Sequence, residues 1–124
     1  MAIFAKSLDL EITAGAMSSL DYKRRFVAEY VQTKVRYERL KAFTNKIEVD
    51  ELTKYPESPK RIIGPKHDCP LHLLRDQQRA MGEYLHVLEL RAVIEEIDLE
   101  SELGLMIEDY TLSAEQCDTC DTDG

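Results

Sequence analysis

The chain has 124 residues, of which 44% are hydrophobic and 7% aromatic, which is enough for one domain with a modest, mainly aliphatic core. No apolar run is long enough to span a membrane and no signal peptide opens the chain, so we expect a cytosolic protein whose three cysteines form no disulfide framework. The formal net charge of −8 comes from the C-terminal end, which should repel nucleic-acid phosphates.

The first element is predicted to be a strand-like arm over residues 1–17. In the stretch SLDLEIT, Leu8, Leu10 and Ile12 alternate with polar residues, which is typical of a short strand that ends near Gly15. Ser18 and Ser19 then offer an N-cap for a helix, which we expect over residues 19–47.

The helix predicted over residues 19–47 contains no Gly or Pro and carries one apolar stripe. The stripe residues are spaced alternately by four and by three: Phe26, Tyr30, Thr33, Tyr37, Leu40, Thr44 and Ile47. Much of the remaining surface is basic, but the tyrosines lie largely on the stripe. Core packing therefore explains them better than nucleic-acid binding does.

A connection rich in Pro and Gly is predicted over residues 48–70, and a second helix over residues 70–99. That helix repeats the same rhythm in Leu71, Leu74, Gln78, Met81, Leu85, Leu88 and Ala92. The two stripes predict a mainly α fold, an antiparallel hairpin of two long helices. In the acidic segment over residues 100–124, the stretch GLMIEDYTLSAE could form a short helix, or a strand that makes a small β-sheet with the N-terminal arm.

A structural zinc site is one reading of the C-x-x-C near the C-terminus. Cys117 and Cys120 could supply two ligands, and Cys69 with His67 would complete a Cys₃His set, with His72 as a substitute ligand. The alternative has Cys69 as a buried apolar residue and the C-terminal tail as disordered. Redox chemistry is rejected because the surrounding acidic residues would raise the thiol pKa.

Residues 93–124 hold 11 acidic residues and no Lys or Arg. A charge block of this kind is usually a solvated face, but it could also bind a basic groove on another protein. The residues we expect at such an interface are Glu95, Glu96, Asp98, Glu102, Glu108 and Asp109. No sequence motif combines a nucleophile with a base, so we expect no enzymatic activity.

The stretch CPLHLLRDQQRAMGEYLHVLELRAVIEEIDL resembles the second helix of a family of small phage and prophage helical-hairpin proteins. The resemblance rests on Cys69-Pro70, Leu73-Leu74, Ala80-Met81, Tyr84-Leu85 and Arg91-Ala92, among others. The upstream stretch YKRRFVAEYVQTKVRYERLKAF resembles the family's first helix. The resemblance implies the hairpin fold and no chemistry, and the acidic C-x-x-C ending departs from the family pattern.

Acidic phage proteins of this size include inhibitors of type II CRISPR effectors, one of them reported to need zinc. The likeness to these proteins in size and acidity leads us to expect an inhibitor that acts in the cytoplasm of an infected bacterial host. The acidic block would occupy the positively charged channel of the RNA-guided nuclease and oppose the entry of DNA. The alternative function is a phage structural or assembly protein that self-associates through its hairpin. Contact with nucleic acid through the first helix is a third reading.

Overall fold

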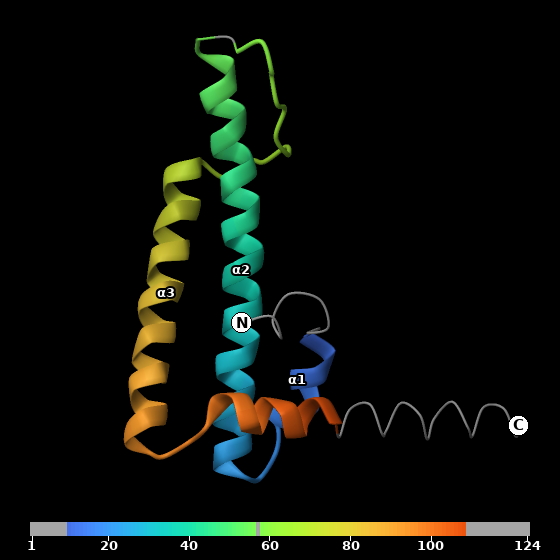
Figure 1. Cartoon of the computed structure of the whole chain (residues 1–124), viewed down its shortest axis with the longest axis vertical. Helices are drawn as coiled ribbons and strands as arrows, with labels where there is room; N and C mark the ends of the chain where they lie inside the picture. Colours follow the sequence, from blue (N-terminus) through green and yellow to red (C-terminus); the bar gives the residue numbers. More distant parts are fainter. Residues whose placement is uncertain (1–9, 57, 109–124) are drawn as a thin grey trace, which may run out of the picture. The chain divides into compact units, whose positions relative to one another are not determined.

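The computed structural model describes residues 10–56 and 58–108, and within these ranges the chain is mainly helical (Figure 1). The named helices are α1 (Leu10–Met17), α2 (Tyr22–Lys54) and α3 (Leu71–Ile94). Residues 99–108 are also helical and are called the C-terminal helical segment below. The described residues contain no strand, so the predicted small β-sheet is not supported. None of their helices is long and apolar enough to cross a bilayer.

The chain divides into two compact units, and both α2 and α3 contribute to each of them. Unit 1 contains the described residues 10–35 and 88–108. Unit 2 contains residues 36–87. The predicted hairpin over the whole helix length stays a prediction, whereas the contacts within each unit can be stated directly.

In unit 1 the predicted strand is wrong where the structure describes it, because residues from Leu10 onward form α1. Ile12, Thr13 and Ala16 are buried. This i, i+4 spacing fits one face of a helix and not the alternation of a strand. The Thr13 hydroxyl donates to the Leu10 carbonyl oxygen at 2.8 Å, a bond within a single helical turn. The alternation of Leu10 and Ile12 was therefore a misleading signal.

The core of unit 1 combines the first part of α2 with the end of α3 and the C-terminal helical segment. Val27 and Leu103 are completely buried, and Leu88 is almost so. At the margin of this core, the Tyr30 hydroxyl donates to Glu89 Oε2 at 2.6 Å. Burial, reinforced by this bond to a carboxylate, raises the pKa of Tyr30 above its ordinary value.

Helix α3 ends at Ile94, earlier than the predicted end at residue 99. Glu96 has φ of 59°, in the left-handed region, and the Ile97 N–H donates to the Ala92 carbonyl oxygen at 2.8 Å. This is a helix-terminating arrangement, and the burial of Ile97 anchors it. Asp98 then accepts the Ser101 N–H at 3.2 Å and caps the C-terminal helical segment.

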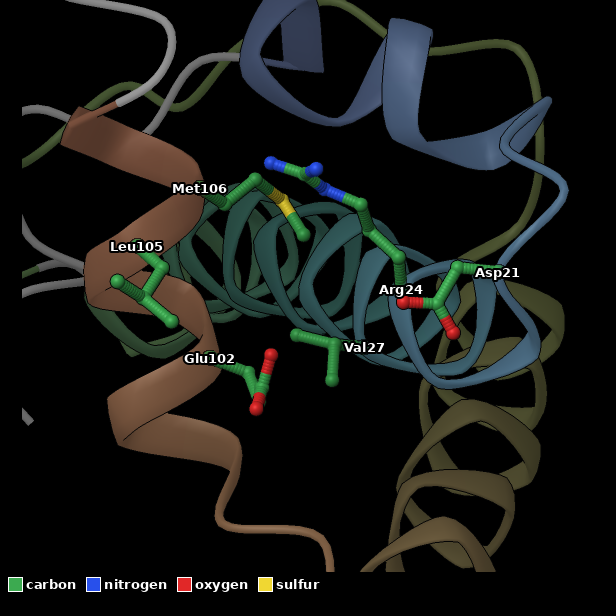
Figure 2. A pocket seen from close by; sticks show the side chains of 6 residues that line it. All are labelled: Asp21, Arg24, Val27, Glu102, Leu105 and Met106. Atoms are coloured by element: carbon green, nitrogen blue, oxygen red, sulfur yellow. The ribbon is translucent and has the colours of Figure 1, made fainter.

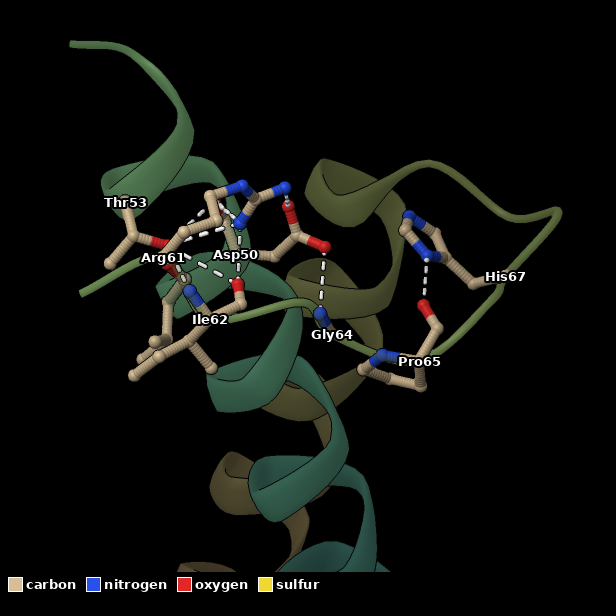
Figure 3. A network of polar contacts seen from close by, with 8 residues as sticks. Asp50, Thr53, Arg61, Ile62, Gly64, Pro65 and His67 are labelled. Carbon is tan, nitrogen blue, oxygen red and sulfur yellow. Dashed lines mark hydrogen bonds and ion pairs between the residues drawn. The ribbon is translucent and has the colours of Figure 1, made fainter. Parts of the chain in front are cut away.

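In unit 2, α2 continues to Lys54, well past the predicted end at residue 47. The connection folds back along its last turns, where Asp50 Oδ1 accepts from Arg61 Nη2 at 2.8 Å and Asp50 Oδ2 accepts from the Gly64 N–H at 2.7 Å (Figure 3). A Cβ at Gly64 would lie only 2.6 Å from the Lys46 carbonyl oxygen, so glycine permits this close approach. These contacts with the connection hold the last turns of α2, which the sequence did not predict to be helical.

Contacts between α2 and α3 show the relative direction of the two helices within each unit. In unit 2, Thr44 contacts Gln78, while Glu48, one turn later, contacts Arg75, one turn earlier. In unit 1, Tyr30 contacts Glu89, and the Tyr22 hydroxyl donates to Glu95 Oε1 at 2.8 Å. Within each unit, therefore, the paired parts of the two helices run in opposite directions.

Candidate functional site

A surface cavity of about 730 Å³ lies in unit 2, and most of its lining comes from one side of α3. The lining residues are Tyr37, Arg75, Gln78, Arg79, Gly82, Glu83, His86 and Val87. Arg75, Arg79, Gly82 and His86 are spaced by four, three and four residues, so they share one helical face. This face presents two guanidinium groups and an imidazole to the same cavity.

Arg75 is held in place by a network of contacts with α2. Its Nη1 lies 2.9 Å from both Thr44 Oγ1 and Gln78 Oε1, and its Nη2 lies 3.0 Å from Glu48 Oε2. Thr44 is completely buried, so the anchor is rigid. The contacts fix the guanidinium orientation before any ligand arrives, which reduces the entropy lost on binding.

Arg79 and His86 are the more exposed nitrogen groups of the cavity. The Arg79 side chain is 67% exposed and forms an ion pair with Asp76 one turn earlier on the same helix. Such exposed pairs contribute little to stability, so an incoming anion can compete for the guanidinium at small cost. His86 is exposed as well.

Gly82 gives the cavity its floor. A Cβ at this position would lie 3.6 Å from the Tyr37 hydroxyl oxygen, and without it Tyr37 lies in the lining of the cavity. Arg, Gln, Tyr and His side chains can all donate hydrogen bonds to a phosphate or carboxylate. The carboxylate of Glu83 also lines the cavity, so its charges are mixed. The guanidinium groups are the part of this lining that can hold a small anion.

Smaller cavities elsewhere have less consistent chemistry. One of about 170 Å³ lies in unit 1, where residues at the start of α2 face the C-terminal helical segment (Figure 2). It combines Arg24 with two carboxylates, those of Asp21 and Glu102. Another, of about 560 Å³ and lined by Ile62 and Ile63 among others, is mainly apolar. Neither places several positively charged groups together. A cavity of about 350 Å³ in unit 1 does bring Arg25 and Arg91 together, beside the carboxylate of Glu29. The Arg91 guanidinium there already contacts Tyr22 and Glu95.

The predicted zinc ligands are only partly within the described residues. Cys117 and Cys120 lie outside them, and the structure groups no three potential metal ligands within residues 10–56 and 58–108. Cys69 is half-buried as a free thiol, and His67 and His72 are exposed. The Nδ1 of His67 lies 3.2 Å from the Pro65 carbonyl oxygen, which can only accept, so Nδ1 carries the proton and Nε2 faces away from that bond (Figure 3). The zinc site stays a prediction.

The predicted partner-binding carboxylates of unit 1 differ in what they contact. Glu95 accepts from Tyr22 and from Arg91 Nε at 3.2 Å, and Glu102 forms a 3.0 Å ion pair with Lys23. Asp98 accepts the Ser101 N–H, which, together with the Ser101 hydroxyl, lowers the pKa of its carboxyl. Glu96 and Glu108 are exposed. Asp109 lies outside the described residues.

The cavity residues were not predicted as a site. Sequence analysis assigned Tyr37 and Gln78 to the apolar stripes and proposed no site containing Arg75, Arg79 or His86. The available signal was the recurrence of cationic or imidazole side chains at the spacing of one helical face, with a glycine between them.

A family model described as Sequestin matches residues 20–94, which is more than half of the chain. The chain belongs to the Sequestin family. No curated protein and no solved structure matches it significantly. The Sequestin match includes every residue that lines the unit 2 cavity. It ends before the 11 acidic residues of the C-terminal block and before both cysteines of the C-x-x-C. The predicted phage origin stays a prediction.

Proposed function

We propose that this chain is a non-catalytic binding protein that holds a small anionic ligand, such as a phosphorylated metabolite, in the unit 2 cavity. The observation that carries the proposal is the convergence of Arg75, Arg79 and His86 on one cavity of about 730 Å³. Cavities of roughly 300–1,000 Å³ suit small-molecule ligands. Guanidinium groups are well matched to phosphate and carboxylate because they form two parallel hydrogen bonds.

The net charge of the chain is negative, so the affinity for an anion depends on contacts within the cavity. A net charge of −8 does not attract an anion from a distance, and charges beyond about 8 Å are largely screened at physiological ionic strength. Affinity must therefore come from the guanidinium groups themselves, each charged hydrogen bond contributing about 1.5–3 kcal/mol.

The test is calorimetric titration of the full chain with inorganic pyrophosphate as the probe. We expect wild-type binding, and an affinity roughly 10-fold or more weaker in Arg79→Gln, because one charged hydrogen-bonding group is lost. Arg39→Gln is the matched control, because Arg39 is exposed on α2 of the same unit and does not line the cavity. Equal affinities in Arg79→Gln and in Arg39→Gln would refute the proposed site.

Inhibition of a type II CRISPR effector is a separate proposal, supported only by the acidic end of the chain. Fewer carboxylates are available for a partner than the sequence predicted, because Glu95, Asp98 and Glu102 already bind groups within unit 1. Target-DNA binding by a guide-loaded effector tests it directly, with and without prior chelation of zinc. Absence of inhibition in both conditions would remove this candidate and leave the small-anion proposal untouched.

A further inference from the structure

Glu83 is an acidic side chain in the lining of the unit 2 cavity, and the binding of an anion does not explain its presence there. It is exposed, and it forms no hydrogen bond or ion pair with any residue that the structure describes. Arg79 lies one turn earlier on the same helix but pairs with Asp76 instead. An acid that precedes its basic partner along a helix forms the better pair, which accounts for this choice. The Glu83 carboxylate is therefore available to a ligand.

Negative charge exceeds positive charge by one among the described residues that line this cavity and their ion-pair partners, with histidine counted as neutral. Arg75 pairs with Glu48 at 3.0 Å. Arg79 pairs with Asp76. Glu83 makes a third carboxylate against these two guanidinium groups. A ligand that carries only negative charge adds to the excess, whereas a ligand that also carries a cationic group offsets it.

We propose that the ligand of this cavity is a small zwitterion, a phosphorylated amine whose phosphate binds Arg79 and whose ammonium group binds Glu83. This inference rests on the proposed anion-binding function and specifies the class of anion. The two side chains are four residues apart on α3, which places their Cβ atoms about 5–6 Å from each other. That spacing suits a phosphate and an ammonium group joined by a short alkyl chain.

Gly82 leaves room for that alkyl chain beside the two charged groups. It directly precedes Glu83 and follows Arg79 by three residues. A Cβ at Gly82 would lie 3.6 Å from the Tyr37 hydroxyl oxygen, so without it a ligand can lie against the helix next to Tyr37. A tyrosine hydroxyl can donate to a phosphate and can also accept from an ammonium group. Both ends of a zwitterion therefore find a partner within the lining.

Calorimetric titration of the full chain with phosphoethanolamine and with propyl phosphate tests the ammonium contact. The two probes have the same size, but a methyl group replaces the ammonium group in propyl phosphate. We expect the wild type to bind phosphoethanolamine roughly 5-fold more tightly, and Glu83→Gln to bind the two probes alike. Glu51→Gln is the matched control, because Glu51 is exposed on α2 of the same unit and does not line the cavity. It changes the net charge equally and should keep the wild-type preference.

Pyrophosphate gives the opposite expectation for the same variant. Glu83 repels a ligand that carries only negative charge, so Glu83→Gln should bind pyrophosphate more tightly than the wild type does, while its affinity for phosphoethanolamine falls. Damage to the fold would weaken the binding of both probes. Opposite changes therefore identify a charge contact.

Three results would overturn the inference and leave the anion-binding function in place, provided that the wild type binds pyrophosphate. These are equal wild-type affinities for phosphoethanolamine and propyl phosphate, a preference that survives in Glu83→Gln, and no binding of phosphoethanolamine. If the wild type failed to bind pyrophosphate as well, the proposed function itself would be refuted, and this inference with it.

Discussion

Thr44 is a polar side chain at a completely buried position, and it links the fold to the cavity. Its Oγ1 lies 2.8 Å from Gln78 Oε1 and accepts from Arg75 Nη1 at 2.9 Å. The sequence predicted its place on the buried stripe but not the polar partners, because periodicity identifies which face is buried and says nothing of the groups that meet there.

Replacement of Thr44 by valine keeps the side-chain shape and removes the hydroxyl. We expect the free energy of unfolding to fall by about 1–3 kcal/mol, because Arg75 and Gln78 lose a buried hydrogen-bond partner. Urea unfolding followed by circular dichroism measures the change. Thr33→Val, at a half-buried position of the same predicted stripe, should change stability by less than about 0.5 kcal/mol. Equal effects of the two substitutions would show that the Thr44 network stabilises nothing.

Asp50 makes the stability of the fold depend on pH. The hydrogen bond from the Gly64 backbone, followed by the one from Arg61, lowers the pKa of Asp50 below its ordinary value of 3.8. Since the folded-state pKa is the lower one, this stabilisation is present above about pH 4 and is lost as pH falls through the folded-state pKa. The difference in urea midpoint between wild type and Asp50→Asn should therefore shrink from pH 7 to pH 2. A constant difference over that range would contradict the account.

At the scale of elements, helix α3 shows what the sequence does and does not reveal. Its apolar rhythm correctly indicated the buried face of Leu85, Leu88 and Ala92. The end of the helix was missed, because the left-handed turn at Glu96 uses a residue without the glycine signal of a helix terminus. The end of α2 was missed for a different reason, since Asp50 ties its last turns to Arg61 and Gly64 of the connection that follows, and helical periodicity carries no signal of such a tie.

Gly82 offers a test at this scale, because it is an interior helical glycine whose missing side chain opens the cavity. Gly82→Ala should raise the free energy of unfolding by about 0.5–1 kcal/mol. The added methyl group meets Tyr37 at an ordinary contact distance of 3.6 Å. It also fills the cavity floor, so pyrophosphate binding should weaken while stability rises. Calorimetric titration and urea unfolding measure the two effects.

Gly104→Ala is the matched control for this substitution. Gly104 lies within the C-terminal helical segment, and a Cβ there meets nothing within 4 Å. This variant should gain stability without any change in binding. If Gly82→Ala kept wild-type affinity for pyrophosphate, the floor of the cavity would take no part in ligand binding.

At the scale of the whole molecule, total charge and local charge point to different functions. The net charge of −8 and the acidic end predicted a basic protein partner. The cavity of unit 2 instead brings two guanidinium groups together, although the net charge of the chain is negative. Net charge does not record which residues a helix places on one face. The mainly helical class followed from residue periodicity, whereas the cavity depended on the contacts between α2 and α3 within unit 2.

The central claim is that the chain retains an anion without converting it, and ³¹P NMR of inorganic pyrophosphate tests this most directly. With equimolar full-length protein, the resonance should shift or broaden, and Arg79→Gln should largely abolish that change. After denaturation and removal of the protein, the pyrophosphate signal should return at full intensity with no orthophosphate. An unperturbed resonance in the presence of wild-type protein would contradict binding, and the appearance of orthophosphate would contradict a non-catalytic role.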